Sequence, residues 1–330
     1  MTSTISTTSC ASYDDATWLL LLNPISGSGL GLRDRPRIEQ AIAAHGLRHV
    51  AALSEYPGHV VALVAEAISR GCRRILVAGG DGSLSEAVNG IFGQQAVAPE
   101  QVRLALLPIG TGNDWARSHG MPGDYGQALR LIAADQTVSH DVGVIDFPAA
   151  DDDLARRFFI NVAGVGFDAG VIERMPSRKL GRIAYLVGLL RELASYRPLP
   201  LRLKIGSGKP GEVQAVEERN ASAFVFFACI NRYCGGGMLV APEAQNDDGL
   251  LDLTLVRHLG RLELLLNLRR LFDGSLASHP KVSTWRCAAA SIEAAAGTAI
   301  EADGELVGHV PAVISVLPRA LRVIAPRAAA

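Results

Sequence analysis

Lysine is scarce in this sequence, and neither sign of charge dominates it. Only 4 of the 32 basic residues are lysine, and 33 acidic residues balance them in a chain of 330. Balanced charge argues against the broad basic surface that nucleic-acid binding needs, so we expect no nucleic-acid partner. Because arginine is used in place of lysine throughout the chain, a single cluster of arginines is weak evidence for a binding site.

Long hydrophobic runs and a secretory signal are also missing. No apolar stretch reaches the roughly 18 residues that span a bilayer, although 48% of the residues are hydrophobic. Residues 1–16 are rich in Ser and Thr without a basic start, and the apolar run Trp18–Leu22 is too short for a signal core. These features predict a cytoplasmic protein, and if it meets membranes it does so transiently, from their surface.

The five cysteines form no recognisable pattern. Their number is odd, their spacing is irregular, and no second pair lies near Cys229 and Cys234 to complete a zinc site. We therefore expect reduced, buried thiols. The sequence has neither the Gly-x-x-x-x-Gly-Lys-Ser/Thr motif of P-loop proteins nor the His-Arg-Asp loop of protein kinases, which excludes both classes.

Residues 1–138 alternate short apolar runs with helical periodicity. The predicted strands are Trp18–Leu22, Leu47–Ser54, Arg74–Ala78 and Val102–Leu107, and the predicted helices are Arg35–His45, Gly58–Arg70 and Ser83–Phe92. Such alternation predicts an α/β fold with a parallel sheet covered on both faces, here a Rossmann-like lobe. Ligands of such sheets bind beyond the carboxyl ends of the strands.

Residues 139–330 have a different pattern of apolar residues. Their apolar segments, separated by turn residues, are Val142–Phe147, Phe158–Val162, Leu199–Ile205, Ala221–Asn231, Leu250–Arg257, Cys287–Glu293 and Ala312–Leu317. Only Lys179–Ser195 and Arg261–Phe272 have helical periodicity. This pattern predicts a C-terminal antiparallel β-sandwich lobe. We expect the boundary near Gln136–His140 and the active site in the cleft between the lobes, and we leave open a return of the extreme C-terminus to the first domain.

Three glycine-rich segments follow predicted strands of the first lobe. The first, residues 23–29, reads Asn-Pro-Ile-Ser-Gly-Ser-Gly. Glycines allow backbone N–H groups to approach an anion closely, and serine hydroxyls add donors. A dinucleotide-binding fingerprint is the competing interpretation, but its third glycine is missing at the required offset.

The second segment, Val77–Ser83, has three glycines around Asp81. Ser83 and Glu86 have the spacing of a capping box for a helix that starts at Leu84. A tight strand–helix turn alone would need fewer glycines, so we expect a functional role. An aspartate here can hold Mg²⁺ through water, and a helix N-terminus can hold phosphate.

The third segment, Leu107–Asp114, also follows a strand and precedes a helical stretch, Trp115–His119. Thr111, Asn113 and Asp114 supply a hydroxyl, an amide and a carboxylate close together. Helix capping explains one of these groups but not all three. We therefore expect this segment to contribute to the same phosphate site.

Together the three segments resemble the diacylglycerol kinase catalytic-domain family, which includes sphingosine and ceramide kinases and soluble bacterial lipid kinases. Later segments are similar to the same family in its order, namely Asp141–Gly143, Asn161–Asp168, Gly235–Met238, Pro242–Asp252 and Glu301–Glu305. The resemblance covers about residues 19–325. It implies a nucleotide-binding lobe followed by a β-rich lipid-binding lobe. Ser83 departs from the family's usual threonine but keeps the hydroxyl.

The resemblance implies an ATP-dependent lipid kinase that transfers the γ-phosphate to a hydroxyl of diacylglycerol or a related lipid. Phosphoryl transfer needs positioning, charge neutralisation and a base. The resemblance gives the base role to Asp303, although Asp303-Gly304 is also an ordinary hairpin turn. Asp81, Asp114 and Asp141 would hold Mg²⁺ through water. The residues expected to contact ATP are Asn23, Ser26, Gly27, Gly79, Gly80, Gly82, Ser83, Gly110, Thr111, Asn113, Asp141 and Glu305.

The resemblance also implies a second, structural Mg²⁺ near Gln245, Asp248 and Leu250. Their spacing suits two backbone carbonyls and one carboxylate around a hard cation, and a plain Asp-Gly turn is the alternative. The basic and apolar segment Arg178–Arg191 either docks on a membrane surface, where the lipid substrate resides, or packs on the core.

Several alternatives stay open at this point. The acceptor is diacylglycerol or another lipid such as a sphingoid base or ceramide, and nucleotide preference and homodimer formation are undecided. NAD kinases share Gly-Gly-Asp-Gly and phosphofructokinases share Gly-Gly-Asp-Gly-Ser, but the other segments fit neither. A non-catalytic lipid-binding regulatory protein is the alternative from another class, and the intact Asp81 and Asp303 argue against it.

Overall fold

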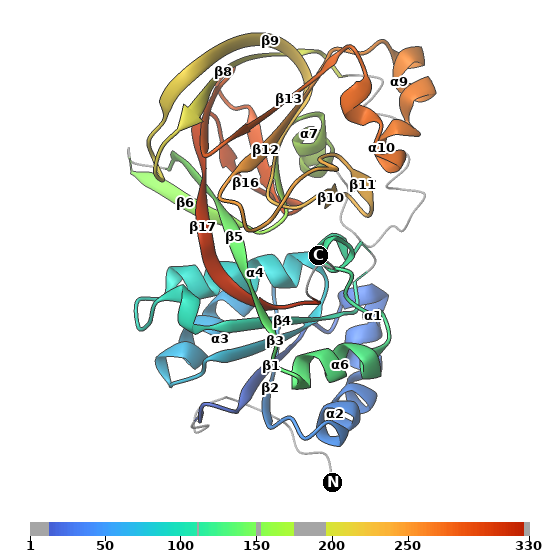
Figure 1. Ribbon diagram of the computed structural model, residues 1–330, viewed down its shortest axis with the longest axis vertical. Helices are drawn as coiled ribbons and strands as arrows, with labels where there is room; N and C mark the ends of the chain where they lie inside the picture. Colours follow the sequence, from blue (N-terminus) through green and yellow to red (C-terminus); the bar gives the residue numbers. More distant parts are fainter. Residues whose placement is uncertain (1–12, 111, 150–152, 175–195, 327–330) are drawn as a thin grey trace. The chain divides into compact units, whose positions relative to one another are not determined.

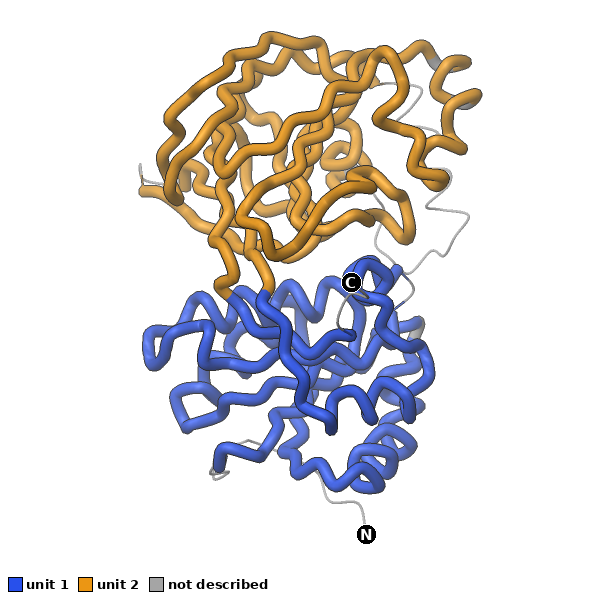
Figure 2. Tube along the Cα trace, in the orientation of Figure 1, with its two compact units in different colours: residues 1–139, 321–330 blue, residues 140–320 orange. Residues whose placement is uncertain are grey.

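The computed structural model describes residues 13–110, 112–149, 153–174 and 196–326 (Figure 1). The chain divides into two compact units, which we call unit 1 (residues 1–139 and 321–330) and unit 2 (residues 140–320) (Figure 2). The chain passes from unit 1 to unit 2 within strand β5 (Thr137–Pro148) and returns within strand β17 (Ala312–Ile324).

Unit 1 is built on a parallel sheet in the order β2-β1-β3-β4-β17. Its other strands are β1 (Trp18–Leu22), β2 (His49–Leu53), β3 (Arg74–Gly79) and β4 (Arg103–Pro108). Its helices are α1 (Ser26–Arg33), α2 (Arg35–Ala44), α3 (His59–Ser69), α4 (Asp81–Gly93), α5 (Asp114–Ser118) and α6 (Tyr125–Ala133), with a 3-10 turn at Pro99–Gln101. The predicted parallel sheet is confirmed.

Both faces of this sheet are buried, which explains why its strands are apolar throughout. All five residues of β1 are buried. Ile38 and Ile42 of α2 and Leu129 and Ile132 of α6 pack with one set of alternating strand side chains, in one core cluster. Strands buried on both faces read as continuous hydrophobic runs rather than as alternating ones. The continuous runs of the first lobe therefore predicted the strands well.

Unit 2 is antiparallel and centres on the long strand β9 (Gln214–Cys229), which pairs with three strands. The other strands are β6 (Leu154–Phe159), β7 (Val162–Gly166), β8 (Leu199–Ser207), β10 (Tyr233–Cys234), β11 (Met238–Leu239), β12 (Leu251–Arg257), β13 (Val282–Cys287), β14 (Ala289–Glu293), β15 (Ala299–Ala302) and β16 (Glu305–His309). Helices α7 (Phe167–Arg174), α9 (Arg261–Asn267) and α10 (Arg270–Asp273) and a 3-10 turn at Leu276–Ser278 accompany them.

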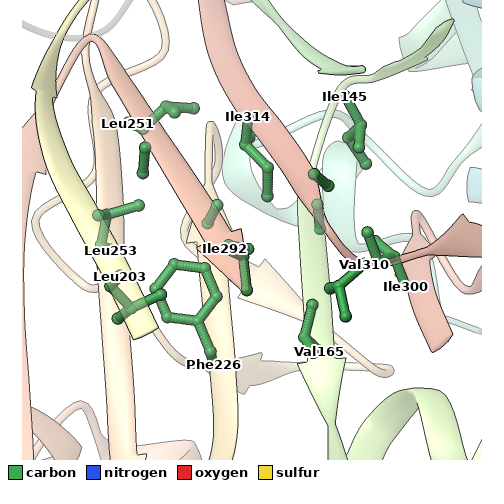
Figure 3. Close-up of a cluster of buried hydrophobic side chains, with 14 of the residues drawn as sticks. Ile145, Val165, Leu203, Phe226, Leu251, Leu253, Ile292, Ile300, Val310 and Ile314 are labelled. Atoms are coloured by element: carbon green, nitrogen blue, oxygen red, sulfur yellow. The ribbon is translucent and has the colours of Figure 1, made fainter. Parts of the chain in front are cut away.

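The core of unit 2 lies between its antiparallel strands (Figure 3). Phe226 of β9 lies beside Leu203 of β8 and Ile292 of β14, and all three side chains are fully buried. Inward-facing apolar residues from strands far apart in sequence thus share one core, as in sandwich folds. The predicted antiparallel β-rich lobe is confirmed.

Some element boundaries differ from the predicted ones. The predicted strand Phe158–Val162 covers the end of β6 and the start of β7, and Cys287–Glu293 is divided between β13 and β14. The predicted helix Arg261–Phe272 consists of α9 and α10, whereas Lys179–Ser195 and the segment Arg178–Arg191 lie outside the described residues. No helix within the described ranges is long and apolar enough to cross a membrane.

Candidate active site

Three loops of unit 1 pack backbone against backbone at the carboxyl ends of β1, β3 and β4. A Cβ atom on Gly27 would lie 2.3 Å from the carbonyl oxygen of Ile109. A Cβ on Gly110 would lie 2.7 Å from the Cα of Gly80. Neither distance is compatible with a real side chain, so the close approach of the loops requires glycine at these positions.

Side chains also tie the first loop to the second. The Asn23 Nδ2 donates a hydrogen bond to the Ser83 Oγ at 2.8 Å, while the Asn23 Oδ1 accepts one from the Ile25 N–H at 3.1 Å. A Cβ on Gly79 would lie 3.5 Å from the Ser26 Oγ. The predicted residues of these two loops therefore meet around the start of α1 and the start of α4.

Asp81 joins the second loop to the third. Its two carboxylate oxygens accept hydrogen bonds from the backbone N–H groups of Asp114 and Trp115, both at 3.0 Å, and so cap helix α5. Asn113 has a left-handed backbone conformation, and its Nδ2 donates to the Gly110 carbonyl at 2.7 Å. Asp81 thus fixes the position of Asp114, which is itself buried.

The predicted capping box is wrong. Helix α4 begins at Asp81, not at Leu84, and its N-cap residue is Gly80, which has no side chain to cap it. Ser83 bonds Asn23 instead, and the Glu86 carboxylate accepts hydrogen bonds from the backbone N–H groups of Gly58 and Val60, at the start of α3. Glu86 therefore caps a neighbouring helix rather than its own.

The meeting point of these loops has the chemistry of an anion site. The first N–H groups of a helix have no partner within the helix, and the helix dipole favours negative charge there. Helices α1 and α4 both begin at this point, with Gly27 and Gly82 in their first turns. Such N-termini bind phosphate groups. Thr111, which we also expect here, lies outside the described residues.

In unit 2, Asp303 sits in the turn between β15 and β16. Asp303 and Gly304 both have positive φ, 50° and 84°, as a tight hairpin turn requires. The Asp303 Oδ1 accepts hydrogen bonds from the N–H groups of Asn161 at 2.8 Å and Val162 at 3.2 Å, and its Oδ2 accepts one from Ile160 at 3.0 Å. Three donors fix the orientation of the carboxylate and favour its ionised form.

A pair of carboxyl groups lies beside this turn. The Glu301 Oε2 accepts a hydrogen bond from the Gly304 N–H at 2.8 Å, and a Cβ on Gly164 would collide with both Glu301 and Asp168. Burial raises the pKa of Asp168 to about 6 and raises the pKa of Glu301 well above its usual range, a shift that the neighbouring Asp168 increases. Glu305 lies farther out, where its carboxylate pairs with Arg157 at 2.8 Å.

Asp141 is fully buried in unit 2. Its Oδ1 accepts a hydrogen bond from the Arg319 N–H at 2.6 Å, and its Oδ2 accepts one from the Gly249 N–H at 2.7 Å. Burial raises the pKa of Asp141, and these two hydrogen bonds oppose the shift. These contacts favour a structural role in holding the loop around Gly249. The expected contact of Asp141 with ATP stays a prediction.

That loop carries the residues predicted to hold a second Mg²⁺. The Asp248 Oδ1 accepts a hydrogen bond from the Leu250 N–H at 3.0 Å, and its Oδ2 pairs with the guanidinium of Arg286. Gln245 is exposed. Carbonyl and carboxylate oxygens suit a hard cation, and one bound here would share the Asp248 carboxylate with Arg286. Within the described ranges, no group of three or more His, Cys, Asp or Glu side chains could hold a metal ion.

Comparison with known proteins agrees with both units. The diacylglycerol kinase catalytic domain matches residues 17–145, and the YegS C-terminal NAD kinase beta sandwich-like domain matches residues 161–325. A diacylglycerol kinase of Mycobacterium tuberculosis is 33% identical over 310 residues, which cover 93% of this chain and 94% of that protein. A probable lipid kinase YegS-like of Chromohalobacter salexigens is 30% identical over 328 residues, 96% of each chain.

The fold is also found among solved structures. The crystal structure of a diacylglycerol kinase from Bacillus anthracis has a TM-score of 0.70 with this chain at 20% identity, and the match covers 94% of this chain and 97% of that one. A parallel-sheet unit and an antiparallel β-rich unit thus form the same two-domain fold as that protein. The chain belongs to the diacylglycerol kinase family, whose members are ATP-dependent lipid kinases.

Proposed function

We propose that this lipid kinase transfers the γ-phosphate of ATP to a hydroxyl of diacylglycerol, giving phosphatidic acid. The surroundings of Asp303 carry the proposal, because three backbone N–H groups hold its carboxylate in one orientation while the residue stays partly exposed. A general base has to be held within hydrogen-bonding reach of the hydroxyl that it deprotonates. Asp303 would accept this proton as the hydroxyl oxygen attacks the γ-phosphorus and ADP leaves.

The anion site of unit 1 is proposed to hold the phosphates of ATP. The N-termini of α1 and α4, with Ser26, Gly80 and Gly82, would bind phosphate oxygens through backbone N–H groups and a hydroxyl. Mg²⁺, when bound, supplies positive charge between the phosphates. Asp81 and Asp114 would hold it through water, since each Asp81 oxygen accepts one N–H group and a carboxylate oxygen can accept a second hydrogen bond.

The test is transfer of labelled γ-phosphate from ATP, with Mg²⁺, into lipids in detergent micelles. The lipids are diacylglycerol, monoacylglycerol, sphingosine, ceramide and phosphatidylglycerol, and NAD⁺ and fructose 6-phosphate serve as controls. We expect label in diacylglycerol. Label confined to another lipid would replace the proposed acceptor, and label in NAD⁺ alone would overturn the lipid reaction. Lipid binding without label in any compound would favour the non-catalytic alternative.

Transient contact with a membrane is part of the proposal, and a run of exposed apolar side chains in unit 2 supports it. Leu262 and Leu266 of α9 are 70% and 75% exposed, and Phe272 of α10 is 59% exposed. The Arg269 side chain between the helices is 88% exposed, although its guanidinium pairs with Asp273 at 3.3 Å. The support therefore comes from the exposed apolar side chains, which suit the interface of a bilayer, where the lipid acceptor resides.

Vesicle binding tests this contact. We expect the triple variant Leu262→Gln, Leu266→Gln and Phe272→Gln to lose co-sedimentation with phosphatidylglycerol vesicles. It should still phosphorylate a short-chain diacylglycerol dissolved as monomers. The matched control replaces Leu154 and Val216, which are 74% and 87% exposed in the same unit, by Gln. Equal vesicle binding by both variants would contradict the contact.

A further inference from the structure

A chain of buried asparagines lies behind the segment that holds Asp303. Asn231 is 1% exposed and Asn161 is 3% exposed. The Asn231 Nδ2 donates hydrogen bonds to the Ile160 carbonyl at 2.8 Å and to the Asn161 Oδ1 at 3.3 Å. The Asn161 carbonyl in turn accepts the N–H groups of Ile230 and Asn231. Asn231 therefore bonds the same backbone segment whose N–H groups hold Asp303.

The chain continues to the loop that contains Asp248 and Gly249. The Asn246 Nδ2 donates to the Asn231 Oδ1 at 3.0 Å, and the Asn246 carbonyl accepts the Asp141 N–H at 2.7 Å. Asp141 then accepts the Gly249 N–H, as described above. A continuous series of hydrogen bonds thus runs from the loop, through Asn246 and Asn231, to the donors around Asp303.

We infer that Asn231 is a positioning residue for Asp303, and that it links the loop of residues 245–250 to the catalytic base. The inference rests on the proposed function, in which Asp303 takes the proton of the lipid hydroxyl. Asn231 touches no reacting atom. It acts on Ile160 and Asn161, and these orient the carboxylate.

Because Asn231 is buried, we expect the loss of its side-chain amide to have a large effect on its neighbours. Removing its amide takes this donor from the carbonyl of the fully buried Ile160, and the loss of a hydrogen-bond partner is costly for a buried polar group. Residues 160–162 would shift to recover hydrogen bonds, which moves the three donors of Asp303. A misplacement of about 1 Å near reacting groups can cost about 100-fold in rate.

The test compares Asn231→Leu, which has a similar volume but no amide, with the full-length wild-type enzyme. The substrates are ATP and short-chain diacylglycerol. We expect kcat to fall roughly 10- to 100-fold, while KM for ATP changes less than about twofold because the predicted phosphate contacts lie in unit 1. Asn246→Leu should lower kcat in the same direction but less, because it leaves the bonds from Asn231 to Ile160 and Asn161 in place.

The matched control is Thr254→Val. Thr254 is also 1% exposed in unit 2, and its hydroxyl donates one hydrogen bond to the Val240 carbonyl, which is not a member of the asparagine chain. We expect this control to lower the melting temperature and leave kcat unchanged. Equal kcat values for Asn231→Leu and Thr254→Val would overturn the inference.

Two further readouts separate positioning from a purely structural role. The rising limb of the pH profile of kcat/KM should move to higher pH in Asn231→Leu, since Asp303 loses donors to its ionised form. Amide hydrogen exchange of residues 160–162 should become faster than in Thr254→Val. Unchanged values of both would overturn the inference, whereas a wild-type enzyme that phosphorylates no lipid would overturn the proposed function instead.

Discussion

The two units hold their polar groups in place by different means, unit 1 by close packing of backbone and unit 2 by hydrogen bonds between distant segments. In unit 1 the expected phosphate site is made largely of backbone, and loops after neighbouring parallel strands approach so closely that Gly27 and Gly110 have no room for a side chain. In unit 2 the proposed base, Asp303, is held by hydrogen bonds from residues distant in the sequence, since Ile160 and Asp303 are 143 positions apart. The first arrangement is sensitive to added volume, and the second is sensitive to the loss of a single donor or acceptor.

This difference predicts which substitutions change KM for ATP and which change kcat. Changes of volume in unit 1 should act on nucleotide binding, and changes of charge or hydrogen bonding around Asp303 should act on turnover. The four predictions below test this division, from the largest expected effect to the smallest.

Asp303→Asn should have the largest effect. Asparagine keeps the shape of aspartate but cannot take up a proton at neutral pH, and general-base catalysis typically contributes about 10²- to 10⁴-fold. We expect kcat to fall by about that amount, with ATP affinity nearly intact by calorimetry. Asp146→Asn is the control, because Asp146 is another carboxylate of unit 2, buried and paired with Arg156. A wild-type rate in Asp303→Asn would remove Asp303 as the base.

Gly110→Ala should disturb nucleotide binding more than turnover. The added Cβ would lie 2.7 Å from the Cα of Gly80, so the two loops must separate. We expect KM for ATP to rise roughly tenfold, as small displacements in a binding site do. Gly93→Ala is the matched control in the same unit, because a Cβ there meets nothing within 4 Å. A lower kcat at unchanged KM would contradict the expectation that changes of volume in unit 1 act on nucleotide binding.

Asp168→Asn should change the pH dependence of stability. Burial disfavours the charge of Asp168 and raises its pKa in the folded protein from the ordinary 3.8 to about 6. The folded protein therefore binds more protons than the unfolded chain between these values, and wild-type stability falls as pH rises through them. Removing the charge should stabilise the protein by about 1–2 kcal/mol at pH 8.

Urea unfolding between pH 4 and pH 8 measures this effect. Asp273→Asn is the control of opposite sign, since hydrogen bonds from Ser275 lower the pKa of Asp273 and stabilise the protein above that pKa. Parallel stability curves for wild type and Asp168→Asn would show that the buried pair does not titrate in this range.

Glu86→Ala should have the smallest effect and should leave catalysis unchanged. Glu86 accepts the N–H groups of Gly58 and Val60 at the start of α3, and loss of such a cap typically costs about 1 kcal/mol. Thermal unfolding would measure the loss, with the exposed Glu100→Ala as control. A change in KM for ATP would show that the cap also supports the anion site.

The sequence predicted unit 1 better than unit 2, for physical reasons. Parallel strands buried on both faces are continuous apolar runs, and the residues of each glycine loop are contiguous. The helix α1 was missed because Ser26–Arg33 contains three glycines, which disfavour a helix when read alone. The predicted capping box was wrong because the Glu86 carboxylate accepts hydrogen bonds at the start of another helix, α3, and not at the start of its own helix.

In unit 2 the residue types were predictable but their partners were not. Asp303, Asn161 and Asp168 lie in segments that carry the family resemblance. Asn231 ends a predicted strand and has no local signal, because its partners Ile160 and Asn246 come from other segments. Side-chain hydrogen bonds between distant segments follow from tertiary packing, which no local pattern encodes.

Because strand β17 lies at the end of the chain, the sheet of unit 1 can be completed only after unit 2 has been synthesised. Its last residues pair with β4, where Arg322 and Val323 face Arg103 and Leu104. The ribosome makes β4 early and this partner only after the whole of unit 2. Until then the sheet of unit 1 has an unpaired edge, which exposes backbone groups to other chains. A chain interrupted before Leu321 would therefore be a substrate for proteolysis or aggregation rather than a working nucleotide-binding domain.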